Sequence, residues 1–177
     1  MIPKKRVALI TGAESGIGKS TSKIFLDNGY KVICTYLKNN NNKNTKDIEY
    51  HRIDITKNKD WENLALYIKK KFKKIDVLVN SAGVRLSGNL ETTSMSDWSY
   101  HLNNNVTGTF LACKYILPFL KKAKNSSIIN VASINSIRGA KNMLAYATSK
   151  SAIISFTASL ALDLIKNKIR VNAVAPG

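Results

Sequence analysis

The residues best suited to proton chemistry are Tyr146 and Lys150, four positions apart near the end of the 177-residue sequence. At this spacing two side chains share one face of a helix. A free tyrosine has a pKa of about 10 and exchanges protons poorly at neutral pH, but a neighbouring ammonium group favours the phenolate form. The pair therefore predicts general acid–base chemistry, although the same spacing is common in solvent-exposed pairs.

A glycine-rich segment, residues 11–18, could bind a phosphate group. It follows a short apolar run and precedes an amphipathic one, so its glycines let the backbone approach a pyrophosphate and the helix N-terminus supplies free N–H groups. Gly18-Lys19-Ser20 also resembles the end of the loop of nucleotide triphosphatases, but that loop requires its first glycine where Ala13 stands. We therefore favour a dinucleotide-binding site. The alternative is a glycine-rich turn that binds no ligand.

The elements that must position these residues alternate along the chain. Continuous β-branched runs predict strands at 7–10, 31–35, 49–53, 76–79, 127–131 and 170–174. Amphipathic runs predict helices at 17–28, 60–72, 98–121 and 147–166. This alternation predicts an α/β fold, a doubly wound parallel sheet with six strands.

Polar or glycine-rich segments follow four of the predicted strands directly. They are the turn at 11–18, the segment Asn80-Ser81-Ala82-Gly83, Ser133, and Pro176-Gly177. Ligands of open parallel sheets bind outside the carboxyl ends of the strands. We therefore expect these segments to converge on one site.

Over residues 7–177 the chain resembles the classical short-chain dehydrogenase/reductases. The family's Thr-Gly-x-x-x-Gly-x-Gly motif corresponds to residues 11–18, and its Asn-Asn-Ala-Gly motif to residues 80–83, with Ser81 in place of the second asparagine. Its Tyr-x-x-x-Lys motif corresponds to Tyr146 and Lys150, and its Arg-x-Asn-x-x-x-Pro-Gly segment to residues 170–177. The resemblance implies a Rossmann-like fold and a nicotinamide-dependent oxidoreductase.

The resemblance also implies roles for four residues, Asn105, Ser133, Tyr146 and Lys150. In the reduction direction the cofactor would deliver hydride to a carbonyl carbon while Tyr146 donates a proton to its oxygen, which Ser133 would hydrogen-bond. Lys150 would favour the phenolate of Tyr146 and bind the nicotinamide ribose. Asn105 would support a water-linked proton path to Lys150.

The residues after the second strand favour NADP over NAD. An acidic residue there usually binds the ribose hydroxyls and selects NAD. Tyr36 occupies this position, and Lys38 could attract a 2′-phosphate. Ser15, where many NADP-preferring members carry a basic residue, and Glu14 count against NADP, so NAD stays the alternative.

We predict a larger set of cofactor-binding residues and no metal ligands. Asp54 and Ile55 match the family position that contacts adenine, and Cys34 and Cys113 do not have a metal-ligand spacing. The predicted cofactor-binding residues are Gly12, Ser15, Gly16, Ile17, Gly18, Tyr36, Lys38, Asp54, Ile55, Asn80, Ala82, Gly83, Tyr146, Lys150, Pro176 and Gly177.

The formal net charge of +17 and the pI of about 10.0 raise the question of nucleic acid or an anionic membrane as a partner. Most lysines fall at predicted helix ends and turns, which indicates a solvated basic surface rather than one patch. The sequence shows neither a signal peptide nor an apolar stretch of about 18 residues. With two cysteines and no disulfide pattern, we expect a cytoplasmic protein that binds neither nucleic acid nor membranes.

Members of the family usually continue beyond the Pro-Gly pair through a substrate-covering segment and a seventh strand, whereas this sequence stops at Gly177. We therefore expect residues 1–177 to form one dinucleotide-binding and catalytic domain, truncated at its C-terminus. The sixth strand would then be an exposed edge. We expect this piece alone to be inactive or poorly soluble.

The expected substrate is a small carbonyl compound or secondary alcohol, with a β-ketoacyl thioester on an acidic carrier protein as a subcase. The resemblance implies a homodimer or homotetramer for the full-length protein. The alternative is a catalytically impaired nucleotide-binding or regulatory protein of the same fold, against which the intact set of four residues argues. A nucleic-acid binder would instead show DNA binding that depends steeply on salt.

Overall fold

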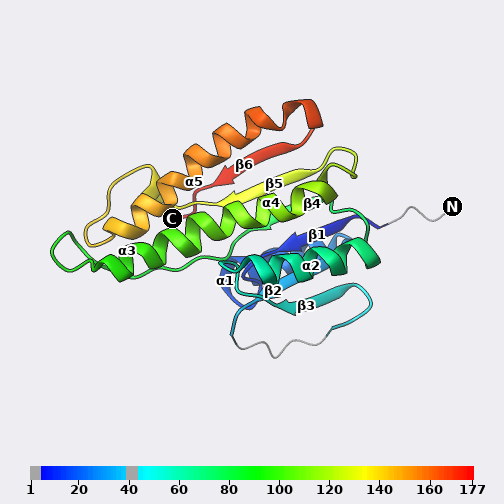
Figure 1. Ribbon diagram of the computed structural model, residues 1–177, viewed down its shortest axis with the longest axis horizontal. Helices are drawn as coiled ribbons and strands as arrows, with labels where there is room; N and C mark the ends of the chain where they lie inside the picture. Colours follow the sequence, from blue (N-terminus) through cyan, green and yellow to red (C-terminus); the bar gives the residue numbers. More distant parts are fainter. Residues whose placement is uncertain (1–4, 39–43) are drawn as a thin grey trace.

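The computed structural model describes residues 5–38 and 44–177 and contains one six-stranded parallel sheet (Figure 1). Its spatial order is β3-β2-β1-β4-β5-β6, so the order reverses between β1 and β4. This confirms the predicted doubly wound fold. The strands are β1 Val7–Ile10, β2 Lys31–Tyr36, β3 Ile48–Arg52, β4 Val77–Asn80, β5 Ser127–Val131 and β6 Arg170–Val174. Residues 39–43, which include most of an asparagine-rich run, lie outside the described residues.

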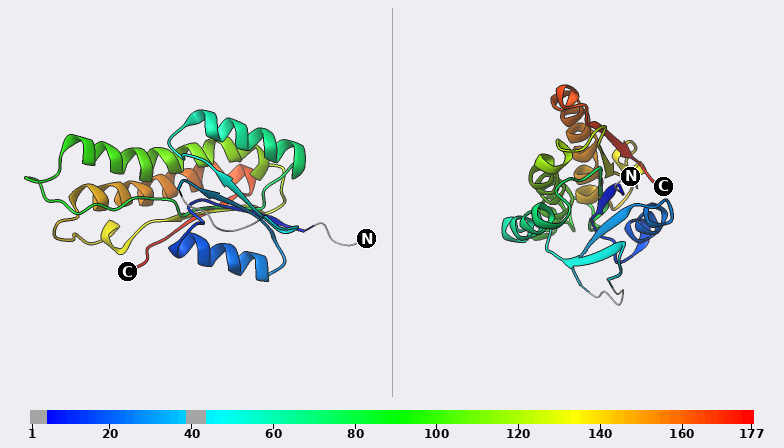
Figure 2. Two further views of the ribbon diagram at one scale, coloured as in Figure 1. Left: turned by 90° about the horizontal axis from the view of Figure 1, so that it is seen from below. Right: turned by 90° about the vertical axis from the view of Figure 1, so that its right-hand side faces the viewer.

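Helices cover both faces of the sheet (Figure 2). Helix α1 (Gly16–Asp27) lies on one face, and α2 (Asn58–Lys71), α4 (Gly108–Leu120) and α5 (Leu144–Asp163) lie on the other. Two short 3-10 helices, Ile134–Ser136 and Ile165–Asn167, flank α5 in the sequence. The parallel strands therefore need the apolar composition on both faces that their sequences provide.

The hydrophobic core has two layers, one on each side of the sheet. The larger layer packs α2 and α4 onto the sheet around Ile68, Ile116 and Trp61, all fully buried. The Trp61 indole N–H also donates to the carbonyl of Ile55 at 2.8 Å. The smaller layer packs α1 against alternate residues of β1 and β2, such as Ile10 and Cys34. The central strands are thus held from both sides, which fixes the positions of their carboxyl ends.

The predicted helix at 98–121 is three segments. Helix α3 (Met95–His101) continues into a π-helical stretch (Leu102–Thr107) before α4 begins at Gly108. Gly108 N–H donates back to the carbonyl of Asn103, five residues earlier. Single π-helical turns widen a helix locally and often occur at functional sites. Here the wide turn carries Asn105, which is 1% exposed.

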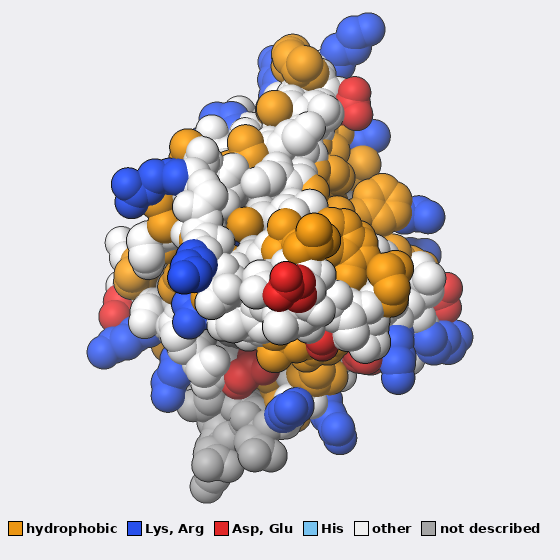
Figure 3. All heavy atoms as spheres, turned by 90° about the vertical axis from the view of Figure 1, so that its left-hand side faces the viewer, with side chains coloured by type: hydrophobic (Ala, Val, Ile, Leu, Met, Phe, Trp, Pro, Cys, Tyr) orange, Lys and Arg blue, Asp and Glu red, His pale blue; other side chains and the backbone are white. Residues whose placement is uncertain are grey.

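The surface seen from the carboxyl ends of the strands is mixed in character. Lysine and arginine side chains are scattered around the rim of this face rather than gathered into one patch (Figure 3). Within residues 5–38 and 44–177, no helix has the length and apolarity needed to span a membrane. Strand β6 pairs with β5 alone among the described strands and forms one edge of the sheet.

Candidate functional site

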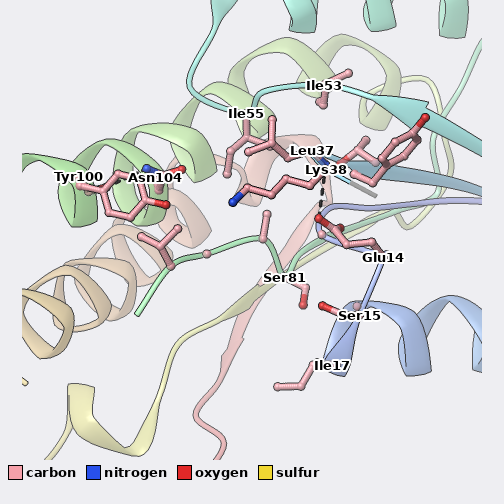
Figure 4. Close-up of a pocket in the computed structure, with 18 residues that line it drawn as sticks. Glu14, Ser15, Ile17, Leu37, Lys38, Ile53, Ile55, Ser81, Tyr100 and Asn104 are labelled. Atoms are coloured by element: carbon pink, nitrogen blue, oxygen red, sulfur yellow. Dashed lines mark hydrogen bonds between the residues drawn. The ribbon is translucent and has the colours of Figure 1, made fainter. Parts of the chain in front are cut away.

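A cleft of about 730 Å³ opens at the carboxyl ends of the strands, above the point where the strand order reverses (Figure 4). In open α/β sheets this is where ligands bind. The turn after β1, the end of β2 and the segment after β4 all contribute to its walls. Its lining residues are Gly12, Glu14, Ser15, Gly16, Ile17, Gly18, Thr35, Tyr36, Leu37, Lys38, Ile53, Ile55, Ser81, Ala82, Gly83, Val84, Tyr100 and Asn104.

The glycine-rich turn is packed so closely that side chains are excluded at two positions. Gly12 has φ +65°, and a Cβ there would lie 2.8 Å from the Cα of Ala82. A Cβ on Gly18 would lie 2.2 Å from the carbonyl oxygen of Gly12. Ser15 precedes α1 without a side-chain cap hydrogen bond, and the first helical residues, Gly16, Ile17 and Gly18, line the cleft. The first N–H groups of a helix have no partner within the helix itself. The turn thus offers a backbone cradle of the kind that binds phosphate.

Thr11 joins this turn to the segment after β4. Its hydroxyl oxygen accepts from the N–H groups of Ser81 and Ala82, both at 3.0 Å. Asn80 lies beneath the cleft rather than in its wall: its amide donates to the Asn130 side-chain oxygen at 2.8 Å, and it is 3% exposed. Of the two residues, Ala82 lines the cleft and Asn80 supports the floor from below.

The far end of the cleft is formed by residues after β2 and β3. The Lys38 side chain extends across the cleft, below Ile55 (Figure 4). Ile53 and Ile55 provide an apolar wall. Asp54 does not line the cleft, because its carboxylate accepts from the backbone N–H and the hydroxyl of Thr56 at 3.0 and 2.7 Å.

Glu14 lies at the same end of the cleft, opposite the side chains from β2. Its Oε1 accepts from the backbone N–H of Leu37 at 3.3 Å, which links the glycine-rich turn to the end of β2 (Figure 4). The carbonyl of Thr35 strengthens this link by accepting from the N–H of Ala13 at 2.9 Å. The sequence shows that Glu14 belongs to the turn. Its contact with Leu37 joins residues 23 positions apart, so no local sequence pattern predicts it.

At the near end of the cleft, three predicted residues from separate elements meet. A Cβ on Gly83 would lie 2.9 Å from Asn105 Oδ1, which leaves no room for it, and 3.4 Å from Lys150 Nζ, an ordinary van der Waals distance. Asn105 Oδ1 accepts from the N–H of Val84 at 2.7 Å, and its Nδ2 donates to the carbonyl of Val84 at 3.0 Å and to the Ser149 hydroxyl at 2.8 Å. Asn105 thus joins the segment after β4 to helix α5.

Lys150 is a buried amine, 6% exposed, that donates to the carbonyl of Val131 at 2.7 Å. Burial lowers its pKa from 10.5 to about 8 because the charged form loses hydration. Val131 ends β5, so this hydrogen bond fixes Lys150 against the carboxyl end of the sheet. Among the described residues, the other two donors of the ammonium group have no protein acceptor, which leaves them available to a ligand.

Ser133 and Tyr146 complete the predicted catalytic set. Ser133 is 7% exposed and its oxygen accepts from the N–H of Asn135 at 3.2 Å, so its hydroxyl proton is free to be donated. The next residue, Ile134, donates its N–H to the carbonyl of Pro176 at 2.8 Å, which places Pro176-Gly177 beside Ser133. Tyr146 lies in the first turn of α5, one turn before Lys150, and no described residue hydrogen-bonds its hydroxyl.

His101 packs beside Tyr146, an arrangement that the sequence gives no means of predicting. It is 1% exposed, and its ring lies edge-on to that of Tyr146 with centroids 6.3 Å apart. Nε2 accepts from the N–H of Leu86 at 2.9 Å, while Nδ1 lies 2.7 Å from the carbonyl of Asp97. The neutral ring protonated at Nδ1 satisfies both contacts. Lone histidines without a partner spacing carry no signal for such an arrangement.

Across the two described ranges, no cluster of three histidine, cysteine, aspartate or glutamate side chains could hold a metal ion. Both cysteines are free thiols in the core, and burial raises the pKa of Cys34 and of Cys113 to about 12.

Comparison with known proteins agrees with this arrangement. Residues 6–177 match the family model described as short chain dehydrogenase. The chain is 35% identical to the 3-oxoacyl-[acyl-carrier-protein] reductase FabG of Thermotoga maritima, over 97% of this chain and 73% of the relative.

Two solved structures share the fold over almost the whole chain. ElxO with NADP bound has a TM-score of 0.89 at 32% identity, covering 98% of this chain and 74% of that one. A short chain dehydrogenase from Leptospira borgpetersenii with bound NAD+ has a TM-score of 0.92 at 29% identity, covering 98% and 71%. The motif order, the sheet order and these similarities lead to one conclusion: the chain belongs to the short-chain dehydrogenase family.

Proposed function

We propose that this protein is a nicotinamide-dependent oxidoreductase that interconverts a carbonyl compound and a secondary alcohol, with Tyr146 as general acid and base. The observation that carries the proposal is the placement of Lys150. Its buried amine lies one helical turn after Tyr146 and donates to Val131, and a Cβ on the cleft residue Gly83 would lie 3.4 Å from it. The relatives that bind NADP and NAD support the same class of reaction.

Tyr146 holds the proton that is transferred. Its hydroxyl has no protein partner among the described residues, so a substrate oxygen can take that place. In reduction the Tyr146 hydroxyl donates its proton to the carbonyl oxygen, and in oxidation the phenolate removes the proton of the alcohol. Lys150 favours the phenolate through its charge.

Ser133 stabilises the substrate oxygen by hydrogen bonding. Its own oxygen is engaged by the N–H of Asn135, which orients the hydroxyl proton away from the 3-10 helix. A fixed donor aimed at an oxygen that gains negative charge lowers the barrier without reorganising during the reaction. Ser133 therefore complements Tyr146 rather than replacing it.

Asn105 acts as a positioning residue in this scheme. All three hydrogen bonds of its side chain go to Val84 and Ser149, so it holds the segment after β4 against α5. Its backbone carbonyl accepts from the Thr109 hydroxyl at 2.8 Å. The water-linked proton path to Lys150 stays a prediction.

The cleft residues fit a nicotinamide dinucleotide. Gly12, Ser15, Gly16, Ile17 and Gly18 would hold the pyrophosphate, because a cradle without Cβ atoms ends there at an uncapped helix N-terminus. Ile53 and Ile55 would flank the adenine. Lys150, Pro176 and Gly177 do not line the cleft itself; Lys150 would bind the second ribose, and Pro176-Gly177 would flank the nicotinamide. When bound, the nicotinamide supplies or accepts the hydride.

Tyr36 and Lys38 support NADP as the preferred form, since Lys38 places a cation in the cleft near the end of β2. Residues 1–177 would act as one catalytic and dinucleotide-binding domain. Its free thiols favour the cytoplasm. For the full-length protein we propose a homodimer or homotetramer, as the family resemblance implies. A β-ketoacyl thioester is one substrate class to test, in view of the similarity to FabG.

The deciding experiment compares wild type with Tyr146→Phe in the full-length protein, using NADPH and NADH against a panel of ketones and acyl thioesters. Oxidation of the reduced cofactor is followed by absorbance. Removal of the hydroxyl should lower kcat by roughly 100-fold or more. Tyr115→Phe is the matched control, because its hydroxyl bonds only to Asn58 at 3.0 Å and lies outside the cleft. Unchanged turnover by Tyr146→Phe would refute the mechanism. A regulatory protein would bind the cofactor and turn over none of the panel.

A further inference from the structure

At the end of β2, the cleft holds two opposite charges that come from different elements. Lys38 follows the strand directly, whereas Glu14 reaches across from the glycine-rich turn. Among the described residues, neither side chain takes part in an ion pair within 4.0 Å. The two charges therefore do not neutralise each other by contact, and each can act on a ligand.

The carboxylate of Glu14 is incompletely satisfied. Oε1 accepts from Leu37 N–H, but Oε2 is buried and has no hydrogen-bond donor in the described part of the chain. A buried charged oxygen without a donor is unfavourable, so the arrangement is completed by a ligand that brings donors. Hydroxyl groups can donate to a carboxylate, whereas a phosphate dianion has only acceptors and a like charge.

Glu14 also accepts from a backbone donor in the wall of the cleft. The N–H of Leu37 is at the end of β2, between Tyr36 and Lys38, and Glu14 already occupies it. A 2′-phosphate entering here would meet the carboxylate and find that amide in use. The hydrogen bond from the N–H of Ala13 to the carbonyl of Thr35 holds the glycine-rich turn against β2, and so holds Glu14 beside Leu37.

We propose that Glu14 supplies, from the glycine-rich turn, the ribose-binding carboxylate that Tyr36 cannot supply from β2, and so weakens the preference for NADP that Lys38 creates. The protein would then use both cofactors, with Lys38 attracting the 2′-phosphate of one and Glu14 accepting from the ribose hydroxyls of the other. This inference rests on the proposed function, because it assigns residues within the proposed cofactor site.

The test uses binding of two adenosine fragments, which does not require turnover. Adenosine 5′-monophosphate carries a free 2′-hydroxyl, and adenosine 2′,5′-bisphosphate carries the 2′-phosphate. Both are titrated by calorimetry into the full-length protein, together with NAD+ and NADP+. Glu14→Gln should raise the affinity for the bisphosphate about tenfold, equivalent to about 1.4 kcal/mol, and lower that for the monophosphate.

Two further variants control this result. Glu62→Gln makes the same change in net charge on α2, outside the cleft, and should leave the ratio of the two affinities unchanged. Glu14→Asp keeps the charge and should retain the weak binding of the bisphosphate. In the Lys38→Ala background Glu14→Gln should still change the ratio, because Glu14 acts on the ligand directly.

Three results would overturn the inference. These are an unchanged affinity ratio in Glu14→Gln, an equal change in Glu62→Gln, or an effect that disappears in the Lys38→Ala background. Failure of wild type to bind either fragment or either cofactor would instead refute the proposed function itself, and this assignment with it. Thermal unfolding of each variant, followed by circular dichroism, establishes that the comparison is made between folded proteins.

Discussion

At the scale of single residues, the site depends on how buried polar groups are satisfied. Lys150 has one protein acceptor, Val131, and Asn105 has all its hydrogen-bonding groups in use. The amine is thus free to act on ligands, while the amide is committed to holding two segments together. Lys150 and Asn105, which the family resemblance assigns to one catalytic set, therefore differ in role: the amine is available to bind a ligand, and the amide holds two segments of the protein together.

Burial of Lys150 should make the stability of the free protein depend on pH. The pKa of Lys150 falls from 10.5 in the unfolded chain to about 8 in the fold, so between these values its titration raises the free energy of unfolding as pH rises. Above about pH 9 the buried thiols of Cys34 and Cys113 have the opposite effect, because burial raises their pKa to about 12. The contribution of Lys150 is therefore the difference between wild type and a Lys150 variant. The full difference corresponds to about 3 kcal/mol. Below pH 8 the cost of burying the charge is present in full.

Lys150→Met should remove the Lys150 contribution, as shown by comparing its urea unfolding with that of wild type across pH 7 to 10.5. It should also abolish turnover, measured by the absorbance of the reduced cofactor. Lys121→Met, at an exposed position, should keep the pH profile of wild type. An identical pH profile in wild type and Lys150→Met would show that the amine is solvated in solution.

His101 should matter for both stability and activity. His101→Leu leaves the N–H of Leu86 without its acceptor, which costs about 1–3 kcal/mol, and loosens the segment beside Tyr146. We expect kcat/KM of His101→Leu to be lower than that of wild type, because this segment lies beside Tyr146. His101→Gln offers an amide oxygen to the same N–H and should recover part of both losses. Steady-state kinetics and urea unfolding measure the two effects, and a His101→Leu protein equal to wild type in both would contradict this role.

At the scale of elements, the turn between β1 and α1 is the most constrained. Gly18→Ala would place a Cβ 2.2 Å from a backbone oxygen that cannot move independently of β1. We expect a loss of about 1–3 kcal/mol in the free energy of unfolding and at least a tenfold loss in NADP+ affinity. Gly139→Ala, with no atom within 4 Å of its Cβ, should change stability by less than about 0.5 kcal/mol. Equal behaviour of the two variants would mean that the turn relaxes freely.

The strands could be predicted to within one residue, because continuous β-branched runs bounded by glycine or polar residues are a local property. The helix ends were less accurate. Helix α5 begins at Leu144 rather than Ala147, since Leu144 N–H donates to the carbonyl of Gly88 at 3.1 Å, a contact made by a distant segment. The π-helical turn was missed, because six residues are too few to separate its period from that of an α-helix.

The segments that follow β1 and β4 were expected to converge, because the carboxyl ends of parallel strands meet at one edge of the sheet, and both line the cleft. The roles of the individual site residues stay predictions. What the sequence could not provide were the side-chain contacts between motifs. The bond from Leu37 to Glu14 and those from Asn105 to Val84 join residues more than 20 positions apart. They depend on the order of strands in the sheet, which no local pattern contains.

At the scale of the whole molecule, the excess of basic residues is spread over the surface. Figure 3 shows Lys and Arg around the rim of the face at the carboxyl ends of the strands, with hydrophobic and acidic side chains between them. Such a distribution gives non-specific attraction to polyanions but no continuous track for a phosphate backbone. We therefore expect duplex DNA to bind only at low ionic strength.

Fluorescence anisotropy titrations at several salt concentrations test this expectation. Binding should be lost by about 0.15 M salt, whereas NADP+ binding, which uses specific hydrogen bonds, should persist. Micromolar DNA binding retained at that salt concentration, or competition between DNA and NADP+, would indicate a nucleic-acid function instead.

The central position of β1 has a consequence for how the chain folds. Its partner β2 follows within one helix, but its other partner, β4, lies about 70 positions away, where Asp76 accepts from the N–H of Val7 at 2.8 Å. Loop-closure entropy opposes such distant pairings until much of the chain has collapsed. We expect the β1–α1–β2 unit to acquire protection from hydrogen exchange first, and the hydrogen bonds of Thr11 to Ser81 and Ala82 to form late. The cleft would therefore be assembled only in the last stage of folding.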